Sequence, residues 1–104
     1  MIVEERIYTL HPGKVAEMVK LYGEEGLPLQ QRYLGKFIGY FSTETGNLNQ
    51  VVFMWGYESL DDRSARRDRL AQDPEWQSYL KKVVPLIMTQ ENRILKPASF
   101  SPIQ

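Results

Sequence analysis

The fold is decided by residues Gly35–Arg69, which read GKFIGYFSTETGNLNQVVFMWGYESLDDRSARRDR. Two apolar runs, Lys36–Ser42 and Leu48–Tyr57, flank the segment Thr43–Asn47, whose small polar residues and glycine favour a turn. Ser59 then precedes an arginine-rich run, with an aspartate three residues later as in a variant of the capping box. The stretch therefore predicts a β-hairpin that leads directly into a helix.

The second strand of this hairpin carries bulky apolar side chains on both faces. Alternation along a strand places Phe53, Trp55 and Tyr57 on one face and Val52 and Met54 on the other. The apolar side chains on both faces of such a sheet must be buried from water. The helices of so short a chain can cover only one face. We therefore expect a homodimer in which the open sheet faces of two copies pack together.

Further elements are predicted on both sides of the hairpin. Residues 1–10 alternate apolar and polar side chains and predict a strand, and an apolar stripe from residue 14 predicts a helix. This helix is expected to weaken at its glycines, to break or restart at Pro28 and to close at Gly35 in a left-handed cap. Another helix is expected to start at Asp73-Pro74, and residues 86–95 predict a last strand.

This order of elements predicts the fold class. Strand, helix, two strands, helix and strand form the βαββαβ pattern of an α+β, ferredoxin-like domain with an antiparallel sheet. In that topology the first and third strands lie side by side at the centre of the sheet, and the helices cover one face. A single domain spanning residues 1–104 is expected from the length of the chain.

The composition argues against several kinds of partner. Thirteen Lys and Arg balance thirteen Asp and Glu, so no net charge attracts nucleic acid or an anionic membrane. Cysteine is absent, and no apolar run approaches the roughly 20 residues that span a bilayer. We therefore expect neither a nucleic acid nor a membrane partner, and a cytoplasmic location. No metal-binding or phosphate-binding motif is present, so we expect no metal and no cofactor.

Charged residues on the predicted first strand are unusual for a central strand. Glu4, Arg6 and Tyr8 share one face of it. Because burying an unpaired ion costs several kcal/mol, these groups either pair with one another or meet a ligand. A structural pair between Glu4 and Arg6 is the simpler interpretation, and a ligand site containing Arg6 and Tyr8 is the alternative.

The arginine-rich helix poses the same choice. At about 100° per residue, Arg63 and Arg67 fall on the side that carries Leu60 and Leu70 and faces the sheet. Arginine can hold a carboxylate or phosphate with two parallel hydrogen bonds, so this pair is a candidate anion site. Alternatively, the two arginines pair with a nearby glutamate or extend past the edge of the helix.

Two further residues are candidate ligand contacts. Trp55 can form part of an aromatic wall for a flat ligand, although such a residue is more often part of the core. Asn49, at the start of the third strand, can donate a hydrogen bond to a ligand or hold the preceding turn. The complete set of ligand-binding candidates is Arg6, Tyr8, Asn49, Trp55, Arg63 and Arg67, and no catalytic residue is assigned.

Several segments resemble the NIPSNAP family over nearly the whole chain. They are Arg6–Gly13 (RIYTLHPG), Thr43–Val52 (TETGNLNQVV), Met54–Leu60 (MWGYESL) and Asp73–Trp76 (DPEW). The resemblance implies a dimeric α/β barrel, in which two ferredoxin-like sheets face one another. It implies no particular activity, although the wider barrel superfamily includes cofactor-free monooxygenases and haem-degrading enzymes.

Three functional hypotheses follow. The first is a homodimeric domain that holds a small molecule, such as an anion, in a pocket between sheet and helices. The second is a non-catalytic module for dimerisation or protein interaction. The third is an enzyme similar to the cofactor-free monooxygenases or to isomerases, with Tyr8 as a hydrogen-bond or proton donor.

Overall fold

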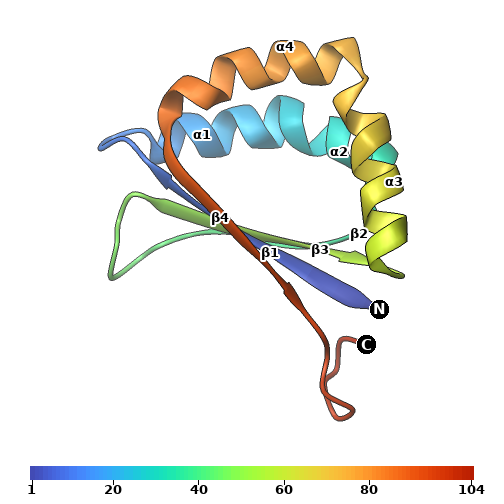
Figure 1. The fold of residues 1–104 in the computed structure, drawn as a ribbon. Coiled ribbons are helices and arrows are strands. Elements are labelled where there is room, and N and C mark those ends of the chain that lie inside the picture. The colour runs from blue at the N-terminus through green and yellow to red at the C-terminus, as the bar shows by residue number, and fades with distance from the viewer.

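The computed structural model describes residues 1–104 as a four-stranded antiparallel sheet with helices on one face (Figure 1). The strands are β1 (Ile2–Leu10), β2 (Lys36–Ser42), β3 (Gln50–Tyr57) and β4 (Ile87–Leu95). Their order across the sheet is β2-β3-β1-β4, so β1 and β3 lie at the centre. The predicted α+β, ferredoxin-like arrangement is therefore confirmed.

The helical layer consists of two connected groups. The first is a continuous run made of α1 (Val15–Leu21), the π-helical turn η1 (Tyr22–Gly26) and α2 (Leu27–Tyr33). The second follows the hairpin and comprises α3 (Leu60–Ala71), α4 (Pro74–Val83) and the short 3₁₀ turn η2 (Val84–Leu86). No helix of the fold is both long enough and apolar enough to cross a membrane.

Both helix starts predicted after the hairpin are confirmed by their caps. The Ser59 hydroxyl accepts a hydrogen bond from the Asp62 backbone N–H, at 3.1 Å. The Asp73 carboxylate accepts one from the Glu75 backbone N–H, at 2.7 Å, with Pro74 at the first helical position. These bonds satisfy N–H groups that the helix itself leaves unpaired, and so they fix where α3 and α4 begin.

The left-handed cap predicted at Gly35 is wrong. The helix ends in extended backbone at Leu34, and the only residues with positive φ are Gly13 and Gly46. Gly35 is needed for a different reason, because a Cβ atom built on it would lie far inside van der Waals contact of the Gly56 carbonyl oxygen on β3. The absence of a side chain, rather than a special backbone angle, allows β2 to start this close to β3.

The first helical run departs from regular α-helix at its glycines and restarts as a second short helix at Pro28, as the sequence predicted. The chain widens into a π turn at η1 and continues into α2, where Pro28 occupies a first-turn position that tolerates proline. A Cβ on Gly26 would lie 2.6 Å from the ring of Tyr79, so this glycine lets η1 pack tightly against α4. The π turn carries Tyr22 into the core.

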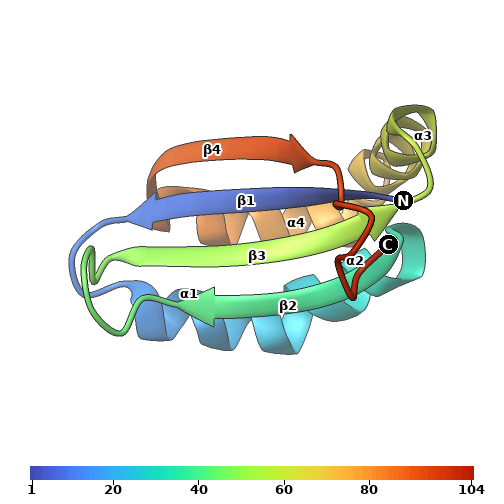
Figure 2. The ribbon, with the colours of Figure 1, turned by 90° about the horizontal axis from the view of Figure 1, so that it is seen from below.

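The two faces of the sheet differ in burial. On the helix side Phe53, Trp55 and Tyr57 are fully buried. On the other side Val52 and Met54 are half-buried, and Phe41 of β2 is 55% exposed. Figure 2 looks onto this open face and shows the C-terminal tail folded back beneath the sheet, close to the start of β1. The helices therefore cover one face only, as the sequence predicted.

Candidate functional site

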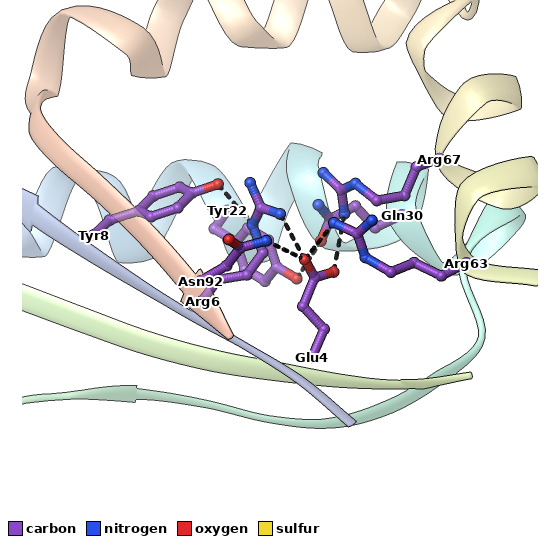
Figure 3. Close-up of polar contacts among 8 residues, drawn as sticks. All are labelled: Glu4, Arg6, Tyr8, Tyr22, Gln30, Arg63, Arg67 and Asn92. Carbon is purple, nitrogen blue, oxygen red and sulfur yellow. Dashed lines mark hydrogen bonds and ion pairs between the residues drawn. The ribbon is translucent and has the colours of Figure 1, made fainter. Parts of the chain in front are cut away.

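A buried carboxylate, that of Glu4, lies at the centre of a polar cluster between the sheet and the helices (Figure 3). Its Oε2 atom accepts hydrogen bonds from Arg6 Nη1 at 3.0 Å, Arg63 Nη2 at 2.6 Å and Asn92 Nδ2 at 2.7 Å. Asn92 reaches this position because it stands opposite Arg6 in the pairing of β1 with β4. The Glu4 side chain is only 1% exposed.

Local geometry brings these side chains together. Alternation along β1 points Glu4, Arg6 and Tyr8 towards the helices, because successive side chains of a strand face opposite sides. On α3, Arg63 and Arg67 are four residues apart and so project from one face of the helix. That face is directed at the sheet, where both guanidinium groups approach Glu4.

Arg67 differs from the other two arginines in its bonding. Its Nη1 atom lies 3.8 Å from Glu4 Oε1, which is within ion-pair distance but too long for a hydrogen bond. This Nη1 atom is buried and has no hydrogen-bond partner, and neither has Arg63 Nε. Buried polar groups are nearly always paired, so these two donors are exceptions within the protein.

The cluster keeps Glu4 ionised. Burial alone would raise the pKa of Glu4, but hydrogen bonds from Arg63 and Asn92 and the charges of Arg6 and Arg67 lower it to about 2. At neutral pH one negative carboxylate therefore faces three positive guanidinium groups. We call this set the arginine cluster, which consists of Glu4, Arg6, Arg63, Arg67 and Asn92.

Two positive charges of the arginine cluster are not balanced within it. On α3, Asp62 pairs with Arg66, at 2.8 Å, and with no arginine of the cluster. The side chains of Arg6, Arg63 and Arg67 are 14–22% exposed, so each keeps some contact with solvent. The arginine cluster therefore carries an excess of positive charge that water reaches only in part.

Buried aromatic side chains adjoin the cluster and add hydrogen-bond donors. Trp55 Nε1 and the Tyr57 hydroxyl are buried without a partner. Burial raises the pKa of Tyr57, although the charge of Arg67 opposes this, so the phenol stays protonated at neutral pH. Tyr22 donates a 2.6 Å hydrogen bond to Gln30, and burial raises its pKa as well. The surroundings of the arginine cluster are thus rich in donors.

Tyr8 connects the arginine cluster to a small cavity under the helices. Arg6 Nε donates a 3.0 Å hydrogen bond to the Tyr8 hydroxyl, and the Tyr8 ring packs edge-on against Phe53. The cavity has a volume of about 30 Å³, which is room for roughly one water molecule. Its walls are mainly aromatic and aliphatic and include Tyr8, Tyr22, Phe53, Trp76 and Tyr79. None of the arginines lines it.

The structure brings together most of the residues that the sequence singled out. Arg6, Arg63 and Arg67 surround Glu4, so the pairing predicted as the simpler interpretation does form, and Tyr8 joins this group through Arg6. Trp55 is opposite Glu4 on β3, whereas Asn49 precedes β3 at the far end of that strand, where its carbonyl accepts the Leu10 N–H. The polar residues of this region that sequence reasoning did not single out are Asn92 and Gln30.

Comparison with known proteins identifies the family of this chain. Residues 3–102 match the model of the NIPSNAP family. The chain belongs to this family. It is 34% identical over 103 residues to the NipSnap protein of Drosophila melanogaster, covering 99% of this chain and 37% of that protein. The chain spans about a third of the length of the curated relatives it matches.

Solved structures agree with this assignment. A NIPSNAP family protein of unknown function from Agrobacterium tumefaciens is 44% identical and superposes with a TM-score of 0.97, covering 100% of this chain and 94% of that one. A putative antibiotic biosynthesis monooxygenase from Nitrosomonas europaea has a TM-score of 0.69 at 11% identity, over 93% of this chain and 98% of that one. The second likeness concerns the fold alone.

Proposed function

We propose that this NIPSNAP domain binds a small anionic molecule at the arginine cluster, between the sheet and the helices. The observation that carries the proposal is the bonding of Arg67, whose buried Nη1 donor has no hydrogen-bond partner and lies 3.8 Å from its counter-ion, Glu4 Oε1. The excess of two positive charges supports it, because an anion would neutralise that excess. The pocket predicted between sheet and helices would then lie around the arginines, beside the aromatic cavity.

Replacing Arg67 by glutamine is expected to abolish stabilisation by small anions. A ligand at one hundred times its Kd stabilises the native state by about 2.7 kcal/mol, which is readily measured as a rise in Tm. The measurement compares melting curves in propionate or phosphate with curves in chloride at equal ionic strength. Since Arg67 makes no hydrogen bond within the chain, the variant should fold normally.

Arg69→Gln is the matched control for this experiment. Arg69 belongs to the same helix and carries the same charge, but it is exposed and takes part in no ion pair of the cluster. Its variant should respond to anions as the parent protein does. Equal anion responses in Arg67→Gln and in the parent would contradict the proposal, and a variant that fails to fold would show that Arg67 is structural.

We also propose that the domain is a homodimer through its open sheet face, as expected from the two apolar faces of the second hairpin strand. The face carries apolar side chains that no helix covers, and it also holds an ion pair of Glu5 with Arg93 at 2.7 Å. A two-fold interface needs only one self-complementary patch, so a second copy is the simplest partner. The apolar members of the patch are Ile7, Phe41, Val52 and Met54.

Phe41→Glu is expected to convert the dimer into a monomer, because it places a charge where two apolar faces would meet. Light scattering after size-exclusion chromatography at micromolar concentration measures the mass. Leu60→Glu is the control, since Leu60 is equally exposed but lies on α3, in the helical layer. A parent protein that is already monomeric at this concentration would refute the dimer. That result would not contradict the proposed anion site, which lies on the other face of the sheet.

An enzymatic role stays an alternative to simple binding. The fold of this chain is shared with putative monooxygenases, and Tyr8 is the side chain of the site best placed to move a proton, because Arg6 holds its hydroxyl. No observation favours this alternative over binding, and the location in the cytoplasm likewise stays a prediction.

A further inference from the structure

Building on the proposed anion site, we infer that its ligand is a small dicarboxylate, held with one carboxylate at Arg63 and Arg67 and the other at Arg6. Three features of the site distinguish this ligand from a monocarboxylate and from a compact anion such as phosphate: the charge of the cluster, the kind of hydrogen-bonding groups it leaves unpaired, and the position of Glu4 between its arginines (Figure 3).

The charge of the site matches a dianion. Glu4 is ionised and neutralises one of the three guanidinium groups, which leaves two positive charges on arginine side chains that are at most 22% exposed. A bound monocarboxylate would neutralise only one of these two charges and would shield the other from water. A dicarboxylate neutralises both.

The hydrogen-bond donors that lack a partner favour a ligand that offers only hydrogen-bond acceptors. The buried atoms without a partner near Glu4 are mostly donors, namely Arg63 Nε, Arg67 Nη1, Trp55 Nε1 and the Tyr57 hydroxyl. Glu4 Oε1 is the only one of them that can accept but not donate, and it already faces Arg67. Ionised carboxylates accept hydrogen bonds and donate none, so two of them satisfy such a site without leaving a donor of their own unpaired.

The position of Glu4 separates the cationic groups into two sides. Figure 3 shows Arg6 and Tyr8 on one side of Glu4 and Arg63 and Arg67 on the other. Arg6 uses Nη1 for Glu4 and Nε for Tyr8, so its Nη2 is free to donate. A compact dianion would have to place both of its charges on one side and beside the Glu4 carboxylate. A ligand with two separated carboxylates avoids that repulsion by reaching both sides.

Calorimetric titration with succinate, propionate and phosphate tests this inference. We expect succinate to bind at least about tenfold more tightly than either of the other two, because it gains a second charge-assisted contact. Arg6→Gln should weaken succinate far more than propionate, so that the two bind with similar affinity. Arg67→Gln should weaken both carboxylates, and Arg69→Gln should weaken neither.

The outcomes separate this inference from the function on which it rests. Phosphate or propionate binding as tightly as succinate, with each still dependent on Arg67, would overturn the dicarboxylate and leave the anion site standing. Failure of all three anions to bind would overturn both. If Arg6→Gln does not fold, Tyr8→Phe serves instead, since the hydroxyl that holds Arg6 in place is lost and succinate binding alone should weaken.

Discussion

Replacing Glu4 by glutamine is expected to lower the free energy of unfolding by about 3 kcal/mol, because the removal of one partner from a buried ion pair typically costs 3–5 kcal/mol. The Glu4 carboxylate is 1% exposed and accepts hydrogen bonds from Arg6, Arg63 and Asn92. Glutamine keeps the shape but loses the charge, so three guanidinium groups would repel one another without compensation. In a domain of this size such a loss lowers Tm by more than about 10 °C.

The dependence of this effect on pH identifies its cause. The pKa of Glu4 in the folded protein is about 2, below the usual 4.5, so its ionised form stabilises the fold above pH 4.5. That stabilisation is lost as the pH falls from 4.5 towards 2. Urea unfolding of the parent protein and of Glu4→Gln, measured between pH 7 and pH 2.5, should therefore show a stability difference that shrinks with acid.

Glu91→Gln is the control for the Glu4 experiment. Glu91 lies on β4, is exposed and takes part in no ion pair, so the same chemical change should alter stability by less than about 0.5 kcal/mol. A Glu4→Gln variant whose stability difference is as large at pH 2.5 as at pH 7 would contradict the electrostatic explanation. The loss would then come from packing.

The sequence predicted the arginine cluster because its members break local patterns. A central strand is expected to be apolar, and Glu4 and Arg6 are conspicuous there for that reason. Arg63 and Arg67 interrupt an apolar helical stripe in the same way. Side chains alternate between the two faces of β1, and residues four apart share one side of α3. These two periodicities sufficed to place Arg6 and Tyr8 on a sheet surface that faces Arg63 and Arg67, without any knowledge of distances.

Other parts of the site depend on information that no local pattern carries. Asn92 contacts Glu4 because of the register between β1 and β4, which brings Asn92 opposite Arg6. The charge of Arg67 on α3 acts on Tyr57 at the end of β3, and this pairing depends on how the helix packs on the sheet. Asn49 is a candidate ligand contact only because it is polar and lies at the start of a strand. This feature does not show at which end of the sheet the arginine cluster lies, and Asn49 is at the opposite end.

The Gly35→Ala variant is expected to lose about 3 kcal/mol of stability or more, the upper end of what overpacking usually costs. The added Cβ would collide with the backbone carbonyl oxygen of Gly56, which cannot rotate away as a side chain would. Relief requires β2 to move from β3 at the position where Lys36 pairs with Gly56. Because Trp55 precedes Gly56, the shift would also disturb the surroundings of the arginine cluster.

Gly23→Ala provides the matched control, because a Cβ on Gly23 meets no atom within 4 Å and its φ is not positive. That variant should be neutral or more stable by up to about 1 kcal/mol, since alanine favours helical backbone. Urea unfolding of both variants measures the contrast. Equal stabilities would mean that the start of β2 is not held against β3. Gly35→Asn extends the test to the left-handed cap predicted from the sequence, because asparagine tolerates positive φ better than alanine does. The Cβ of asparagine would meet the same carbonyl oxygen of Gly56, so this variant should be at least as unstable as Gly35→Ala.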